Sequence, residues 1–323
     1  MQTQDAEVRD SLVAAMNLSA LREREAAETL ASFDGPEQPA LRTSLDDAER
    51  FLGNVASKLD VDRDRFERIL DQHQIELKRI HEEWRAEIVK NSSAAAKDLD
   101  QQVASRRKAL DALTASTFKP VVENLDSPFL IWATPANMLT DSQIEPFASR
   151  AKFFFQSTAR SGTRQLDFYY LWRNPVDRFA VINIDGYLVL NGFCRAGENG
   201  GFLPGDRRTS ISLTTKMVPL EWWNQPPTSP LFQSSQSEVV LAFSASGGGG
   251  FGDVGAIETR TLSRSSGLGY TFFMIPPNGV TVIKYSLIAS FSRGSNGSGS
   301  VIVDFDSDAF RVMSPFVTIQ ILT

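Results

Sequence analysis

Cysteine and histidine are nearly missing from this 323-residue chain, which contains one cysteine and two histidines. The lone Cys194 cannot form a disulfide within the chain, so packing must stabilise the fold. Both histidines, His73 and His81, lie in the first third of the sequence. A Ser-His-Asp or Cys-His arrangement within the last two thirds is therefore excluded. Because Cys194 ends an apolar run, we predict that its thiol is buried and inert.

Excess positive charge and long apolar runs are lacking as well. The formal net charge is -6 and the sequence pI is about 5.2, which argues against general attraction to nucleic acid. No segment approaches the roughly 18 apolar residues of a membrane-spanning helix. Residues 1–7 lack the basic and apolar regions of a Sec signal. We expect no nucleic-acid partner, no transmembrane helix and synthesis in the cytoplasm, with incorporation into a particle or release by a non-Sec route both open.

One stretch resembles a cofactor motif, the glycine-rich segment 246–255, which contains Gly250-x-Gly252-x-x-Gly255 after an apolar run. A dinucleotide site requires a helix after these glycines, because the N-H groups at the start of that helix bind the pyrophosphate. Residues 256–262 alternate like a strand instead. We therefore predict no cofactor, and we interpret the segment as a flexible tip that joins two antiparallel strands.

A second stretch, Asp304-x-Asp306-x-Asp308, resembles the opening of an EF-hand calcium loop. Ala309 stands where the loop requires glycine, which excludes that motif. On a strand the three carboxylates share one face, so either a solvated edge that blocks aggregation or a different calcium site would explain them. We favour the solvated edge and predict no metal site. No pair of acidic residues is marked out for catalysis, so we expect no catalytic residues and no enzyme activity.

Two halves of the chain differ in composition. Residues 1–118 carry 23 acidic and 17 basic side chains with two glycines and two prolines, whereas residues 119–323 carry 16 of each charge with 19 glycines and 13 prolines. Dense mixed charge with few helix breakers is typical of helices, while glycine, proline and aromatic residues are typical of strands and turns. The predicted fold class is α + β in separate domains, with long N-terminal helices in 1–118 and an antiparallel β-sandwich or jelly-roll-like domain in 119–323.

An apolar stripe runs through the first half, with steps of four and three residues that match positions a and d of a coiled coil. A single helix cannot bury such a stripe, so we expect partner helices, either from sister chains in a coiled coil or from the same chain folded back as a bundle. The stripe resumes at Leu99 and Val103. The predicted seam residues are Leu41, Leu45, Leu52, Val55, Leu59, Phe66, Leu70, His73, Leu77, Ile80 and Trp84.

The second half contains about eleven short segments with the alternation of half-buried strands. Turn signals separate them, among them 185–186, 263–267 and 276–279. This pattern predicts an antiparallel sandwich. The ranges are 129–133, 152–156, 166–172, 179–184, 187–193, 210–218, 238–244, 269–275, 280–291, 300–305 and 316–322.

Two adjacent tryptophans mark the candidate ligand site, Trp222, Trp223, Asn224 and Gln225. Neighbouring strand residues point to opposite faces, so both indoles cannot enter one core unless the backbone bends. The second indole either covers the proline loop that follows, or covers an intersubunit surface, or forms an aromatic platform for a sugar or protein with the two amides as hydrogen-bonding groups.

Our preferred interpretation is a non-catalytic, self-associating assembly or attachment protein that presents β-sandwich heads on a helical stalk. Several heads would bind a protein or glycan ligand together, and multivalency would convert weak contacts into strong ones. One alternative is a pore-forming toxin or membrane-active protein that uses the helical region or the glycine-tipped hairpin. Another is a structural scaffold component of a larger particle.

Overall fold

A computed structural model describes the chain from residue 79 to residue 322 with gaps. Strands make up 69% of the described residues, and helical residues make up 14%. By internal contacts the described residues belong to two compact units, and the division falls between Asn91 and Ser92. The described residues are 79, 82–83, 85–90, 92–93, 95–105, 107–108, 121–134, 144–198, 207–222, 232–247, 255–294, 299–306 and 310–322.

One sheet contains six antiparallel strands in the order β10-β8-β12-β6-β2, with β9 beside β8. Side chains of these strands alternate between a buried inner face and a more polar outer face. On β8, for example, Ile211 and Leu213 are buried, whereas Ser210 and Ser212 are partly exposed. The strands are β2 (Leu130–Thr134), β6 (Ser161–Arg173), β8 (Arg208–Trp222), β9 (Phe232–Gln233), β10 (Gln236–Ser246) and β12 (Val280–Arg293).

The second sheet contains nine antiparallel strands, ordered β1-β15-β7-β14-β4-β3, with β11 also paired to β7 and β13 paired to both β5 and β7. A short 3-10 helix, Pro146–Ala148, lies between β3 and β4. The strands are β1 (Val121–Leu125), β3 (Ile144–Glu145), β4 (Arg150–Ala151), β5 (Phe153–Ser157), β7 (Ala180–Glu198), β11 (Ala256–Ile275), β13 (Ser300–Phe305), β14 (Arg311–Met313) and β15 (Val317–Leu322).

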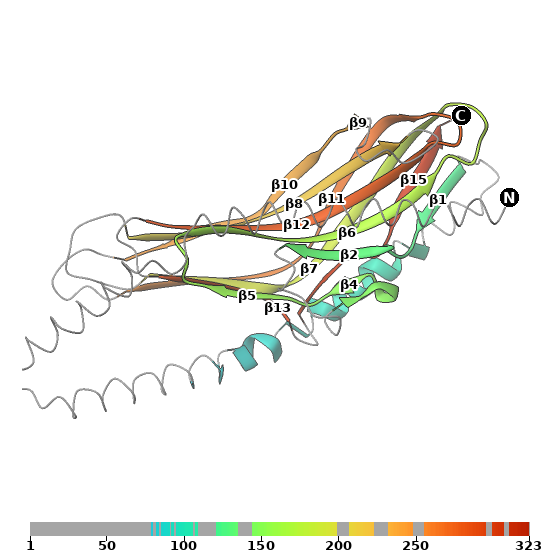
Figure 1. The fold of residues 1–323 in the computed structure, drawn as a ribbon. Coiled ribbons are helices and arrows are strands. Elements are labelled where there is room, and N and C mark those ends of the chain that lie inside the picture. The colour runs from blue at the N-terminus through green and yellow to red at the C-terminus, as the bar shows by residue number, and fades with distance from the viewer. Residues whose placement is uncertain are drawn as a thin grey trace, which may run out of the picture. The chain divides into compact units, whose positions relative to one another are not determined.

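The two sheets enclose one hydrophobic core (Figure 1). Leu166 and Phe168 of β6 and Leu287 of β12 extend into it from the six-stranded sheet, and Ile182 and Ile184 of β7 extend into it from the nine-stranded sheet. All five side chains are fully buried. Burial of apolar surface between two sheets in this way is the arrangement of a β-sandwich.

The predicted fold class of long N-terminal helices beside a β domain is wrong for the part of the chain that the structure describes. That part has one short helical segment, between residues 79 and 108, and no long N-terminal helix or coiled coil. Of the residues before Ser92, the described ones show an Arg79–Glu83 ion pair at i,i+4 spacing, which supports a helix locally. The seam residues predicted from Leu41 to Trp84 lie outside the described residues.

Residues 92–108 show what covers the described end of the stripe, at Leu99 and Val103. Leu99, which continues the stripe, is 4% exposed and packs against Tyr187 and Val189 of β7 and against Phe316, with Val103 beside them. Asn191 Nδ2 also donates a hydrogen bond to the Ser92 carbonyl at 3.4 Å. Helical spacing shows that a stripe must be buried but not what buries it, and here a sheet face provides the apolar surface.

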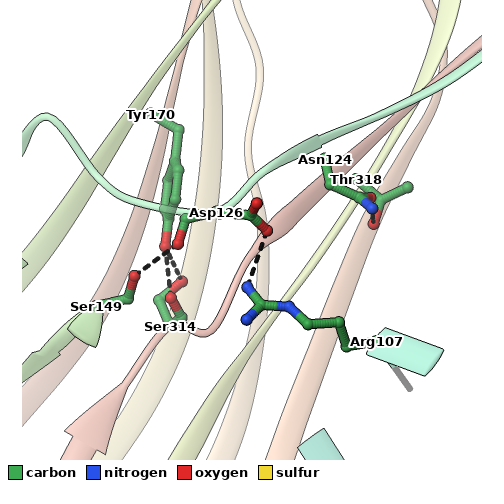
Figure 2. Close-up of polar contacts among 7 residues, drawn as sticks. All are labelled: Arg107, Asn124, Asp126, Ser149, Tyr170, Ser314 and Thr318. Carbon is green, nitrogen blue, oxygen red and sulfur yellow. Dashed lines mark hydrogen bonds and ion pairs between the residues drawn. The ribbon is translucent and has the colours of Figure 1, made fainter. Parts of the chain in front are cut away.

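Charged contacts hold the same segment in place, and Figure 2 shows the one between Arg107 and Asp126. Arg107 donates a hydrogen bond to Asp126 at 2.9 Å, and its guanidinium lies 5.8 Å from the centre of the Phe316 ring. Asp100 pairs with Arg311 of β14. The helical segment is therefore joined to the nine-stranded sheet by both apolar and charged contacts.

Tyr170 links the two layers through a buried hydroxyl, which Figure 2 also shows. The side chain comes from β6, and its hydroxyl donates to the Ser314 carbonyl at 2.6 Å and lies 2.9 Å from Ser314 Oγ, just after β14. Ser149, at a left-handed φ of 51°, donates to the Asp126 carbonyl at 2.9 Å. Burial raises the pKa of Tyr170 above its usual range, so the hydroxyl stays a hydrogen-bond donor.

Two predicted turns are wrong, because 185–186 lies inside β7 and 263–267 lies inside β11. Gly186 is needed for packing rather than for a turn: a Cβ at this position would lie 3.2 Å from the Met217 methyl and 3.3 Å from the Tyr285 ring. The turn predicted at 276–279 is confirmed, since the Gly279 amide donates to the Pro276 carbonyl at 2.9 Å. Asn278 takes the left-handed conformation there, with φ of 57°.

Candidate functional site

The predicted tryptophan site begins at the C-terminal end of β8. Trp222 is the last residue of this strand and is paired with Val280 of β12. Its side chain, together with Trp223, Asn224 and Gln225, lies outside the described residues. The aromatic platform therefore stays a prediction.

The glycine-rich segment connects the two sheets rather than two strands of one hairpin. β10, before it, pairs with β8, and β11, after it, pairs with β7. The strand predicted after the glycines is confirmed, which leaves no helix there to bind a pyrophosphate. The edges of the sheets are joined through Glu238, whose carboxylate accepts from Arg264 Nη2 and Ser266 Oγ, both at 2.7 Å.

The aspartates at 304 and 306 do not form the solvated edge that we expected. β13 is paired on both sides, with β5 and β7, and Asp304 is 1% exposed. Its carboxylate accepts the Asp306 amide at 3.0 Å, while Asp306 lies 3.8 Å from Lys152 Nζ. Asp308 lies outside the described residues, among which no group of three metal-ligating side chains is found.

Cys194 is buried, as predicted, in the middle of the nine-stranded sheet. It lies on β7 between Arg260 of β11 and Val303 of β13. Burial, and secondarily the negative charge of Asp304, raises the pKa of its thiol well above the usual range. The nucleophilic thiolate is therefore disfavoured.

A thiol reagent should not label Cys194 in the native protein, because the side chain has no exposed surface and stays protonated. We expect less than about one tenth of the thiol to react with Ellman's reagent while the same protein in guanidinium chloride reacts fully. Stoichiometric labelling of the folded protein would contradict this burial.

An open groove of about 400 Å³ lies over the outer face of the six-stranded sheet. It crosses β10, β8 and β12, which run side by side (Figure 1). Three strands that are distant in sequence supply its lining, so it exists only in the folded chain. The lining residues are Arg208, Ser210, Ile211, Ser212, Ala242, Phe243, Ser290, Phe291 and Ser292. A larger hollow of about 530 Å³ is lined only by residues 98–105 of the helical segment among those described, so no second described element converges on it.

Strand register sets the serines in rows across the groove. Ser210 is paired with Ser292, and Ser212 is paired with Ser290. Neighbouring strands are about 4.8 Å apart, and alternate residues on one strand are about 6.7 Å apart. The four hydroxyl-bearing residues thus occupy a grid of about these dimensions. Small side chains at these positions leave the space above the sheet open.

Hydrogen-bonding capacity remains available in this groove. The hydroxyls of Ser210, Ser212 and Ser292 have no protein partner in the described part of the chain, and Ser290 shares only a long 3.4 Å contact with Thr163. Each hydroxyl can donate one hydrogen bond and accept others. The floor beneath them is rigid, since Ile211 and Phe291 are buried in the core.

Arg208 places one positive charge at the end of the groove. Its Nε donates to Ser244 Oγ at 2.9 Å, which orients the guanidinium on the β10 side. Its terminal nitrogens have no hydrogen-bond partner in the described ranges. A guanidinium held in this way can bind hydroxyl, carboxylate or sulfate oxygens.

The groove was missed at the sequence level, although part of its signal is visible there. Serines alternate at 210 and 212 and again at 290 and 292 within two predicted strands. That spacing places each pair on one face. It does not show that the two faces adjoin, which depends on pairing between residues about 80 positions apart.

Comparisons with known proteins leave the family open. No family model matches the chain, and no curated protein matches it. The TmCBM61 module, solved in complex with β-1,4-galactotriose, is 8% identical, with 62% of this chain and 88% of that chain covered and a TM-score of 0.20. The enzymatically active domain of bacteriophage CBA120 tailspike protein 4 is 8% identical, with 62% and 19% covered and a TM-score of 0.18. TM-scores at this level do not establish a shared fold.

In the described ranges, no helix has both the length and the apolar character that crossing a membrane requires.

Proposed function

We propose that this chain is a non-catalytic binding protein with an attachment role, and that it binds glycans in the serine-lined groove. The observation that carries the proposal is the grid of four serine hydroxyls above the sheet, three of them without a partner in the described part of the chain, with the Arg208 guanidinium at its end. Sugars present many hydroxyl groups, and such groups exchange hydrogen bonds with serine hydroxyls and guanidinium nitrogens.

Binding without catalysis is proposed because the groove supplies hydroxyls but no group to activate them. Both histidines precede the sheets in sequence, and Cys194 is buried away from the groove. The serines alone are weak nucleophiles, since a serine needs an adjacent base. The groove is open and polar, which favours a ligand held by several modest hydrogen bonds.

Ser290→Trp should weaken glycan binding at least about tenfold, which corresponds to about 1.4 kcal/mol. Ser290 is exposed and lines the groove, so an indole there would fill the space without disturbing the core. The wild-type chain is first screened on an array of neutral and acidic oligosaccharides. The variant's affinity for the bound sugar is then measured by calorimetry.

The matched control is Ser237→Trp, an exposed position on β10 outside the groove. Its affinity should stay within about twofold of wild type, and both variants should keep the wild-type melting temperature within a few degrees, as surface substitutions usually do. Undiminished binding by a folded Ser290→Trp protein, or no bound sugar on the array, would contradict the proposed function.

A further inference from the structure

Arginine residues converge at the end of the sandwich where the groove lies. Backbone hydrogen bonds bring them together: the Arg293 amide donates to the Arg160 carbonyl at 2.7 Å, and the Gly294 amide donates to the Arg208 carbonyl at 2.8 Å. The Gly247 amide donates to the Arg207 carbonyl at 2.9 Å. Arginines of β8, of β12 and of the segment before β6 therefore meet at one end of the sheets. We call Arg160, Arg207, Arg208 and Arg293 the arginine cluster.

Several guanidiniums of the arginine cluster have capacity for an anion. Arg160 and Arg208 are exposed and form no ion pair in the described part of the chain. Arg293 Nη1 donates to the Gly299 carbonyl at 3.2 Å, while its Nε is buried with no hydrogen-bond partner among the described residues. A buried donor without a partner costs free energy, which a bound anion would relieve.

Carboxylates do not neutralise the arginine cluster fully. Glu198 lies among the arginines, 2% exposed, and accepts the Thr209 hydroxyl at 2.6 Å. Of the described residues at this end, the cluster's four arginines therefore lie near one buried carboxylate, in a chain whose net charge is -6.

We infer that the ligand of the groove is an anionic glycan, one that carries carboxylate or sulfate groups. This inference rests on the proposed glycan binding and names its chemical class. The hydroxyl grid would bind the sugar hydroxyls, while Arg208 and Arg160 would bind the acidic groups at its end. Nucleic acid fits less well, because base stacking needs open aromatic faces, whereas Phe291 is buried and Phe243 packs against the core.

The test compares dextran sulfate with neutral dextran as probes of the full chain. We expect dextran sulfate to bind at least about tenfold more tightly than dextran, with an affinity that falls as salt rises. Arg160→Ser combined with Arg208→Ser should weaken dextran sulfate binding by about tenfold or more. The control pair, Arg173→Ser with Arg178→Ser, removes the same charge from exposed positions outside the arginine cluster. These two substitutions should change the affinity for dextran sulfate by less than about twofold.

Each contrary result would contradict a different part of the inference. Equal binding of both dextrans that survives the Arg160 and Arg208 substitutions overturns the anionic preference and leaves glycan binding intact. Equal weakening by the control pair overturns the assignment to the arginine cluster, because it shows that only net charge matters. A DNA duplex bound as tightly as dextran sulfate overturns the restriction to glycans. The proposed function itself fails separately, through the array and the Ser290→Trp protein.

Discussion

Gly192→Ala should destabilise the protein by about 3 kcal/mol, at the upper end for overpacking of a core. Gly192 lies in the middle of β7, and a Cβ there would lie 2.4 Å from the Asp304 carbonyl and 2.5 Å from the Phe305 ring. Phe305 is fully buried and Asp304 belongs to the paired strand β13, so neither can move freely. The melting temperature should fall by roughly 6–12 °C.

Gly267→Ala provides the matched control on the neighbouring strand β11. A Cβ at Gly267 would meet nothing closer than 3.9 Å. The same substitution should therefore change stability by less than about 0.5 kcal/mol, or raise it slightly by reducing the entropy of the unfolded chain. Calorimetric melting of both variants checks the prediction. Equal melting temperatures would mean that β7 and β13 do not approach each other as closely as described.

Leu99→Asp should release the helical segment 92–108 from the nine-stranded sheet. The change removes a buried leucine from its contacts with Tyr187, Val189 and Phe316, and it places a carboxylate on the same apolar surface. Loss of the leucine alone costs about 2–5 kcal/mol, and the buried charge adds to this cost. Limited proteolysis should cut the segment in the variant much faster than in the wild type.

Gln101→Asp adds the same charge at an exposed position of the same segment and should leave the cleavage rate within about twofold. Mass measurement in solution separates packing on the sheet from the self-association predicted from the sequence. If Leu99→Asp lowered the oligomeric mass while proteolysis stayed unchanged, the stripe would contact sister chains rather than the sheet.

The sequence pattern predicted strands correctly where the structure depends on contacts between neighbouring residues. The segment 300–305 is a strand as predicted, because alternation and flanking turns are properties of neighbouring residues. The break predicted at 185–186 failed for the opposite reason. Asp-Gly is a frequent turn pair, but Gly186 lies within β7 and packs closely against Met217 and Tyr285, which come from distant strands.

Burial of charged residues was likewise decided by distant partners. Asp304 belongs to an acidic run whose sequence predicts exposure to solvent. In the structure β13 lies between β5 and β7, and the Asp304 carboxylate is buried. Three consecutive phenylalanines, Phe153, Phe154 and Phe155, are typical of a strand that is covered on both faces. Phe154 is 40% exposed while its two neighbours are buried, so this strand has one solvent-facing side.

By itself, the sequence determined that residues from about 129 onward form strands, that Cys194 is buried, and that the stripe containing Leu99 must be covered. Only the tertiary structure decided that a sheet face covers Leu99, that β10 and β11 join different sheets, and that Ser210 and Ser212 lie beside Ser292 and Ser290. Side-chain alternation is fixed by the geometry of a single strand. Strand pairing depends on contacts between residues far apart in the chain, where many registers satisfy the same local pattern.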